Sequence, residues 1–347
     1  MLTPASLLSY LRLRGINGTN ALFQGQWGVS AYQGRNTLLF ARAGSLHLTI
    51  KQAGSWRHDQ RQALTREAEW YWLAHNDSRF LAFRCFLPRI YSWDPERSIF
   101  VMETIPGKSF PQLPQHQRFH PPHAAQLGQA MALVHSGCAE AIASPDLARH
   151  FPRDLPSFLN VPQAAQRNAQ SKALSAGQKE FYSVLRVHPE FDPLLAQLRE
   201  SWRTETLIHS DWKLANCLID ASAPTPTPHI IDWELVHHGD SIWDAATLLQ
   251  SYWNYWVEHP SLHPLTEIRP ALSAFWSAYC SARHWSTEES AANRTRAVAF
   301  AGARMLQTIF ESTAKLDTIQ PNHVRLMQAS LNILQDPAAA TKEFFPA

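Results

Sequence analysis

A short polar loop between two strand-like runs constrains the fold of this chain more than any other feature. The segment Leu207–Asp220 reads LIHSDWKLANCLID, so that an apolar pair leads into His209 and Asp211, and Asn216 follows five positions after the aspartate. A third oxygen-bearing side chain, Asp232, follows in the strand-like run HIIDWEL. The pattern predicts strands whose ends bring these three side chains to one point.

This combination of side chains suits phosphoryl transfer. One carboxylate can accept the proton of an attacking hydroxyl group, while an amide and a second carboxylate can hold Mg²⁺ on the phosphates of a nucleotide. The alternative is that Asp211 and Asp220 are ordinary turn residues and that Asn216 caps a neighbouring element. The His-x-Asp-x4-Asn spacing alone does not decide between these two interpretations.

The first third of the chain has the pattern of a small sheet with a helix. Residues 1–14 form an amphipathic run that Gly15 ends, and strand-like runs with a hairpin turn at Ala43–Ser45 cover about residues 22–52. A run with helical spacing and two further strand-like runs follow, at residues 61–76, 86–93 and 98–105. We expect these elements to form an N-terminal lobe of residues 1–105.

Beyond residue 110 the pattern is mostly helical. Helical runs lie at residues 124–137, 175–203, 297–313 and 323–335, and the last two are the clearest. Residues 141–165 contain several prolines and are expected to form a loop or an insertion. The chain is therefore predicted to be an α+β protein with a helical C-terminal lobe of residues 106–347 that carries the loop described above.

Composition excludes several classes of function. The 31 basic and 29 acidic residues give a net charge of +2, too small for a general nucleic-acid-binding surface. Four cysteines lie far apart without a CxxC pair, which predicts reduced thiols in a cytoplasmic protein. There is no signal-like N-terminus and no apolar run of about 18 residues, so no contact with a membrane is expected.

The order of the motifs resembles the aminoglycoside phosphotransferase and choline-kinase-like family. The segments HSDWKLANCLID and HIIDWELVHHGDSIWDAATLL follow that family's pattern HGDxxxxNxxxD…xIDWExxxxGDxxxDLA over Leu207–Leu249. The resemblance implies a bilobal protein-kinase-like fold, with a small antiparallel sheet and one key helix in the N-terminal lobe. It also implies a kinase that uses ATP or GTP with Mg²⁺. By position, Asp211 is similar to the catalytic base, and Asn216 and Asp232 are similar to the two metal ligands.

The N-terminal lobe adds residues that the resemblance places around the nucleotide. Lys51 ends a strand and is placed like the lysine that contacts the phosphates, and Glu67 is placed like the helix glutamate that pairs with it. Glu69 is the competing partner, but the REAE register favours Glu67. The turn over the phosphates and the hinge beside the base are expected at Gly34, Arg35, Asn36, Met102, Glu103 and Thr104.

One residue departs from the family pattern within the catalytic loop. Ser210 replaces the usual glycine, and a serine is strained there if the loop requires a positive φ. His209 is expected to support the loop, Asp244 to brace it, and Asp240 to cap the following helix. All the catalytic positions are occupied, which favours an enzyme over a nucleotide-binding pseudokinase that serves as a scaffold.

The acceptor is the least determined feature. The C-terminal part contains several arginines and is not strongly acidic, which disfavours a polycationic acceptor such as an aminoglycoside. GRNTLLF, FLPRIY, DWELVHHGDSIWD and AGARMLQT resemble the kinases that modify ribosomally made peptides. That resemblance implies phosphorylation of Ser or Thr in a precursor peptide and a partner lyase that eliminates the phosphate. A small-molecule kinase is the alternative.

Two further clusters are expected to have no catalytic role. His116, His120 and His123 lie beside two prolines that are expected to interrupt any helix, which predicts a solvated loop rather than a metal site. The aromatic run QSYWNYWVEHP is expected to lie mostly in the core, with one or two rings free to line the acceptor cleft.

Overall fold

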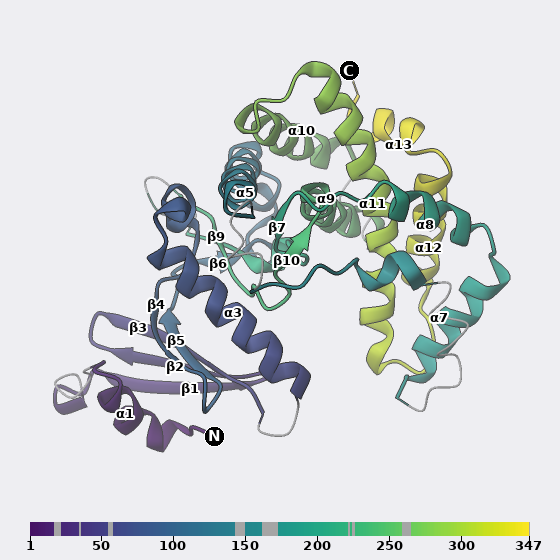
Figure 1. Cartoon of the computed structure of the whole chain (residues 1–347). Helices are drawn as coiled ribbons and strands as arrows, with labels where there is room; N and C mark the ends of the chain where they lie inside the picture. The colour runs from purple at the N-terminus through teal and green to yellow at the C-terminus, as the bar shows by residue number, and fades with distance from the viewer. Residues whose placement is uncertain are drawn as a thin grey trace.

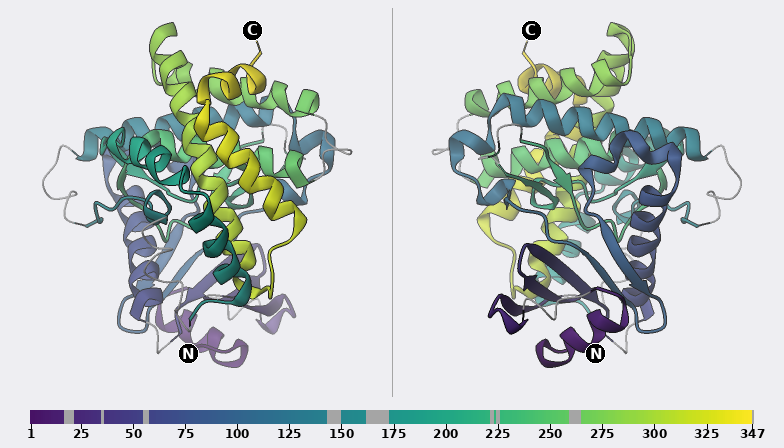
Figure 2. Two further views of the ribbon diagram at one scale, coloured as in Figure 1. Left: turned by 90° about the vertical axis from the view of Figure 1, so that its right-hand side faces the viewer. Right: turned by 90° about the vertical axis from the view of Figure 1, so that its left-hand side faces the viewer.

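The computed structural model describes residues 1–16, 22–34, 36–54, 58–142, 150–161, 173–220, 223, 226–258 and 265–346. Within these residues the first part of the chain is built around an antiparallel sheet, and the later part is mostly helical (Figure 1). In the side views of Figure 2 the sheet and the N-terminus lie at one end of the molecule, and the C-terminus lies at the other.

The N-terminal sheet has five strands in the order β1-β2-β3-β5-β4, and each neighbouring pair is antiparallel. The strands are β1 (Trp27–Gln33), β2 (Thr37–Ala43), β3 (Leu46–Gln52), β4 (Ile90–Asp94) and β5 (Ile99–Glu103). Ala43 pairs with Leu46 across a two-residue turn, and Gly44 there has a φ of 66°. A hairpin turn of this length favours glycine at its first position, so the turn predicted at Ala43–Ser45 is confirmed.

Side chains alternate between the two faces of the sheet. On β5, Ile99 and Val101 join a small core with Leu7 and Leu11 of α1 (Pro4–Leu13), whereas Phe100 and Met102 belong to the main core on the other face. The helix α3 (His58–Asn76) covers that second face, as Figure 1 shows. A 3-10 helix, η1 (Ser78–Phe86), follows α3 directly.

The rest of the described chain is dominated by helices. The longer ones are α5 (Pro121–Ile142), α7 (Ala176–Val187), α8 (Phe191–Glu200), α9 (Ser241–Glu258), α10 (Leu265–Ala282), α11 (Thr287–Ser312), α12 (Pro321–Gln335) and α13 (Pro337–Phe344). Short helices lie at η2 (Phe110–Gln112), α4 (Gln115–Arg118), η4 (Ser157–Asn160), η5 (Leu214–Asn216) and η6 (Thr313–Lys315). Gly128 lets α5 cross α10 closely, because a Cβ at that position overlaps the carbonyl of Phe275.

Two small sheets hold the loop between β7 and β9. In one, β10 (His237–Gly239) pairs with β7 (Thr206–Ile208); in the other, β8 (Cys217–Ile219) pairs with β6 (Lys108–Ser109) and β9 (His229–Ile230). These pairings place the polar residues after β7, before β8 and after β9 next to one another, as the sequence pattern predicted. The strand β6 follows the large sheet in the chain, but it pairs with β8 of the C-terminal part. We therefore retain residue 105, just before β6, as the proposed end of the N-terminal lobe.

Three sequence predictions need correction. The strand expected at 86–93 begins only at Ile90, because η1 continues to Phe86. The strand expected over HIIDWEL ends at Ile230, because Asp232 adopts a φ of 69° that no β-strand allows. The prolines at 121 and 122 start α5 rather than interrupt it, since proline is tolerated in the first turn of a helix.

The start of α5 at Pro121 also changes the surroundings predicted for His116, His120 and His123. His123 is buried, its Nδ1 lies 3.0 Å from the carbonyl of Gln117, and its ring meets Phe110 edge-on, so it is not part of a solvated loop. The expected loop at 141–165 lies partly outside the described residues, and its described parts are the end of α5 and residues 150–161 with η4. Among the described residues, every helix is too short or too polar to cross a bilayer.

Candidate active site

A cavity of about 340 Å³ separates the N-terminal sheet from the loop between β7 and β9. Its walls come from β1, β2, β3 and β5 on one side, and on the other from Asn216 in this loop and from Asp232 and Glu234 in the segment after β9. Apolar side chains such as Leu38 and Leu218 line it together with the polar groups. An apolar cleft with a few convergent polar groups at one end is typical of a small-molecule site.

Lys51 connects the two sides of this cavity. Its Nζ lies 2.6 Å from Oε2 of Glu67 and 2.5 Å from Oδ1 of Asp232. Strand alternation explains why Lys51 can reach Glu67 on α3. Leu48 and Ile50 point to the α1 side of the sheet, and Lys51 therefore points to the α3 side. Glu67 is fully buried on α3, whereas Glu69 is half-buried and lines a separate surface hollow. The Lys51–Glu67 pair expected from the REAE register is therefore present.

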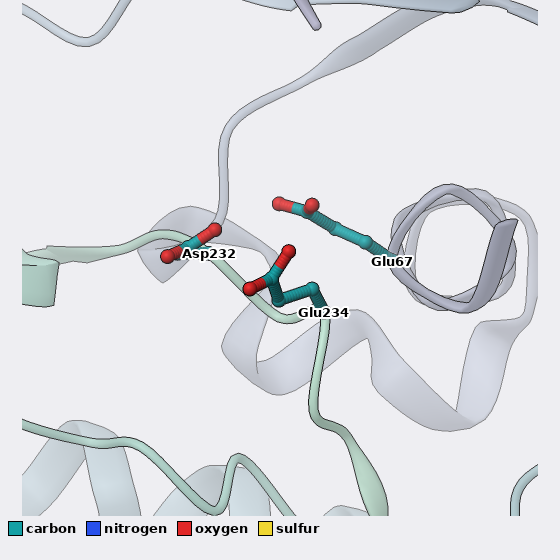
Figure 3. Close-up of side chains that lie close together, drawn as sticks. All are labelled: Glu67, Asp232 and Glu234. Carbon is teal, nitrogen blue, oxygen red and sulfur yellow. The ribbon is translucent and has the colours of Figure 1, made fainter. Parts of the chain in front are cut away.

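Three carboxylates meet around this lysine. Oxygen atoms of Glu67, Asp232 and Glu234 lie within 4.8 Å of one another, and Figure 3 shows the three side chains directed toward one point. Burial raises the pKa of Glu67 to about 7 despite the neighbouring Lys51. Burial opposes the charged forms of Lys51 and Asp232 as well. The carboxylates of Glu67 and Asp232 outweigh burial at Lys51 and raise its pKa, and Lys51 outweighs burial at Asp232 and lowers the pKa of that carboxylate. Such a cluster of hard oxygen donors fits Mg²⁺.

Asp211 lies in the loop with both carboxylate oxygens engaged by cations. Its Oδ1 accepts a hydrogen bond of 2.7 Å from Nη2 of Arg304, and its Oδ2 lies 2.7 Å from Nζ of Lys213. Burial disfavours the charged carboxylate, but Arg304 and Lys213 outweigh burial and hold the pKa of Asp211 below its usual value. Asn216 donates from Nδ2 to the carbonyl of Asp211 at 2.9 Å, which leaves the amide oxygen of Asn216 as a candidate metal ligand.

The backbone before Asp211 is strained and braced. Ser210 has a φ of 70°, so the positive φ considered from the sequence is present. Asp244, in the first turn of α9, accepts hydrogen bonds from the backbone N–H groups of His209 and Ser210 at 2.7 and 2.8 Å. The buried His135 lies 3.1 Å from the same carboxylate. Asp240 accepts a hydrogen bond from the N–H of Ile242 at 3.0 Å, as expected for a helix cap.

His209 holds two parts of the loop together. Its Nδ1 accepts a hydrogen bond of 3.2 Å from the N–H of Asp211, so its Nε2 carries the proton and donates to the carbonyl of Ile231 at 2.9 Å. The ring also lies 4.5 Å from the ring of Trp233. These contacts tie the segment that carries Asp211 to the segment that carries Asp232, which is the supporting role expected of His209.

All the other residues predicted around a nucleotide that the structure describes lie at the cavity. Gly34, Asn36, Met102, Glu103 and Thr104 all line it, and Arg35 lies outside the described residues. The N–H groups of Glu103 and Thr104 already donate to the carbonyls of Arg89 and His47, at 2.8 and 2.9 Å. These two N–H groups are not available to the edge of a base, so a base contact here requires other backbone groups of the hinge.

Three charged residues at the site were not predicted from the sequence. Glu234 stands two positions after Asp232 and accepts a hydrogen bond of 3.4 Å from Asn36. Lys213 is part of the loop motif itself. Arg304 belongs to the run AGARMLQT, nearly one hundred residues after Asp211, and local sequence gives no signal that the two side chains meet.

A model of the phosphotransferase enzyme family matches residues 39–288, which is more than half of the chain. The chain belongs to this family. Its membership confirms the prediction of a phosphotransferase, while no curated protein matches the sequence. The helical segments after residue 288, which include the one that carries Arg304, lie beyond the matched region.

Solved structures show the same fold at low identity. An ethanolamine kinase from Plasmodium vivax is 14% identical, with 96% of this chain and 89% of that chain covered at a TM-score of 0.64. A microcompartment-associated aminopropanol kinase is 15% identical, with 93% and 97% covered at 0.59. A spectinomycin phosphotransferase in complex with ADP and spectinomycin is 15% identical, with 98% of each chain covered at 0.55. The expected kinase-like α+β fold is confirmed.

Proposed function

We propose that this protein is a Mg²⁺-dependent kinase that transfers the γ-phosphate of ATP or GTP to a hydroxyl group of an acceptor. The observation that carries the proposal is the convergence of Lys51, Asp232 and Asn216 on one cavity, together with the hydrogen bond from the amide of Asn216 to the carbonyl of Asp211. Phosphoryl transfer depends mainly on positioning and on charge stabilisation, which such an arrangement supplies. A turn or cap role for Asp211 and Asn216 explains neither the buried lysine nor the third carboxylate.

Each residue receives a role from its place. Asp211 is the proposed base that accepts the proton of the attacking hydroxyl group, and Lys51, held by Glu67, is the proposed contact to the phosphates. Asn216 and Asp232 are the proposed ligands of Mg²⁺, with Glu234 close enough to assist. When bound, Mg²⁺ neutralises charge on the phosphates. Gly34, Asn36 and the hinge Met102–Thr104 are the proposed walls of the nucleotide site.

The charges beside Asp211 bear on the acceptor. Lys213 and Arg304 both contact the carboxylate, so a polycationic acceptor meets two positive charges where it must place its hydroxyl group. We therefore favour a neutral or anionic acceptor. A Ser or Thr hydroxyl of a ribosomally made precursor peptide, followed by elimination of phosphate by a partner lyase, is the acceptor we propose from the sequence resemblance. The alternative is a small hydroxylated molecule.

The first experiment tests catalysis without knowledge of the acceptor. ADP formation from Mg·ATP, or GDP formation from Mg·GTP, is measured for the wild type, for Asp211→Ala and for Asp232→Ala, with water or a panel of hydroxyl compounds as acceptor. We expect both substitutions to lower turnover at least about 100-fold, while circular dichroism and melting temperature show folded protein. Turnover equal to the wild type in either variant contradicts the assigned role. A wild type that binds nucleotide without turnover supports the pseudokinase instead.

The second experiment identifies the acceptor class. Candidate precursor peptides and small alcohols are incubated with the enzyme and Mg·ATP, and mass spectrometry detects the gain of one phosphate on the acceptor. Phosphorylation of Ser or Thr in a peptide, absent with Asp211→Ala, supports the peptide proposal. Phosphorylation of small alcohols alone contradicts it and leaves the kinase proposal intact.

A further inference from the structure

Arg304 occupies an unusual position for an arginine. It lies on α11, its side chain is only 2% exposed, and the adjacent and i−3 positions on that helix, Ala303, Met305 and Ala301, are buried and apolar. Among the described residues, the guanidinium group makes one hydrogen bond, from Nη2 to Oδ1 of Asp211 at 2.7 Å. A carboxylate oxygen of Glu311, which is half-exposed, lies 3.8 Å from Nη1.

This arrangement is costly as a purely structural feature. Within the described part of the chain, Nε and Nη1 of Arg304 are buried and have no hydrogen-bond partner. Burying a cation with unpaired N–H groups is unfavourable, and an apolar side chain of similar size at such a position is often neutral or better for stability. Packing alone therefore does not account for an arginine at position 304.

The two oxygens of Asp211 are held differently. Oδ1 is bonded to the buried Arg304, which α11 fixes in place, whereas Oδ2 faces Lys213, whose side chain is 37% exposed and can move away. Asn216 adds only a long bond of 3.3 Å to Oδ2. A carboxylate held through one oxygen presents the other in a fixed direction, and a small error in the placement of a catalytic group costs much of its rate.

We propose that Arg304 is a positioning residue for phosphoryl transfer: it fixes Oδ1 of Asp211, so that Oδ2 is the oxygen that meets the acceptor. The inference rests on the proposed function. In the reaction, the acceptor O–H bond breaks and its proton passes to Oδ2 as the acceptor oxygen forms a bond to the γ-phosphorus. The bond from that phosphorus to the β,γ-bridging oxygen breaks, the electron pair leaves with the nucleoside diphosphate, and Oδ2 later returns the proton to water.

The kinetic test compares three variants in the hydrolysis of Mg·ATP, with water as the acceptor. Arg304→Met removes the charge at similar size, Arg304→Lys keeps a charge that can reach Oδ1, and Arg269→Met removes a peripheral arginine that pairs with the exposed Glu343. We expect Arg304→Met to lower kcat at least about 30-fold while KM for ATP stays within twofold, and Arg304→Lys to recover most of that loss. Arg269→Met should match the wild type.

A structural readout keeps the proposal testable if hydrolysis is slow. A crystal structure of Arg304→Met with Mg²⁺ and a non-hydrolysable ATP analogue should show the Asp211 carboxylate rotated away from its wild-type orientation. A carboxylate in its wild-type orientation overturns the proposal, and so does a kcat for Arg304→Met within threefold of the wild type. If Asp211→Ala keeps wild-type turnover, the proposed function fails, whatever Arg304 does.

Discussion

At the scale of single residues, the segments that carry Asp211 and Asp232 contain strained backbone that hydrogen bonds hold in place. Ser210 and Asp232 both adopt left-handed backbone conformations, with φ values of 70° and 69°. Ser210 directly precedes Asp211, the proposed base, and Asp232 is itself a proposed metal ligand. Residues other than glycine persist in this region only when their surroundings hold them there. Two contacts hold Ser210: its N–H donates to Oδ1 of Asp244 at 2.8 Å, and its carbonyl accepts a hydrogen bond of 3.1 Å from the indole N–H of Trp243.

The strain at Ser210 predicts the effect of restoring glycine. The left-handed conformation costs a residue with a Cβ about 1–2 kcal/mol, whereas glycine loses about 0.5–1 kcal/mol through the entropy of the unfolded chain. Ser210→Gly should therefore raise the free energy of unfolding by up to about 1.5 kcal/mol, the difference between those two costs. Urea denaturation measures the change.

Ser210→Ala is the matched control, because alanine keeps the Cβ and therefore the strain. Its free energy of unfolding should stay close to that of the wild type. Equal stabilisation by glycine and by alanine contradicts the strain explanation and points to the serine hydroxyl instead.

At the scale of secondary-structure elements, the first turn of α9 supports the loop. Asp240 caps this helix, and Asp244, one turn later, turns inward to bind the loop backbone and lies against His135 on α5. Burial lowers the pKa of His135, which therefore stays neutral at neutral pH. One helix end thus fixes the position of the segment that carries Asp211 relative to two other elements.

Asp244→Asn tests this support. The side-chain amide of asparagine accepts hydrogen bonds only through its oxygen, and it turns an NH₂ group toward one of the two N–H donors, those of His209 and Ser210. At least one buried N–H group therefore loses its partner, at a cost of about 1–3 kcal/mol. We expect a loss of that size in unfolding free energy, and a lower rate of ADP formation. Asp77→Asn is the control, since Asp77 accepts from Arg79 at an exposed helix start, and it should change stability by less than about 1 kcal/mol. Equal losses in both variants contradict the bracing role.

At the scale of the whole molecule, the two proposed lobes share one core. The main hydrophobic cluster runs from α3 and β5 through α5 to the helices of the C-terminal part without interruption. Trp70 of α3 stacks on Trp233 at 4.6 Å, and Trp233 contacts His209 of the loop that carries Asp211. A helix of the N-terminal part is therefore packed directly against the segment that carries Asp232.

This shared core predicts cooperative unfolding. We expect one calorimetric transition for the whole chain, with equal calorimetric and van't Hoff enthalpies. Trp70→Ala should lower the stability of that single transition by about 3–5 kcal/mol, because Trp70 is fully buried between the two parts. Two separate transitions, with only one of them shifted by Trp70→Ala, contradict this expectation.

Local signals in the sequence accounted for much of the fold. Hydrophobic periodicity located the strands around Lys51 and the helix that carries Glu67, because alternation and helical spacing depend on neighbouring residues alone. It misplaced the strands near Ile90 and Ile230. In the first case a 3-10 helix extends further than its pattern indicates, and in the second a left-handed residue ends the strand.

The sequence by itself determined the residues of the proposed chemistry and their order along the chain, because His209, Asp211, Asn216 and Asp232 form a compact motif with fixed spacing. Only the tertiary structure decided what surrounds them. The contact between Arg304 and Asp211 joins residues on α11 and in the loop, and the carboxylates beside Lys51 come from α3 and from the segment after β9. Such contacts depend on how distant elements pack, and that packing sets the charge and the orientation of these side chains.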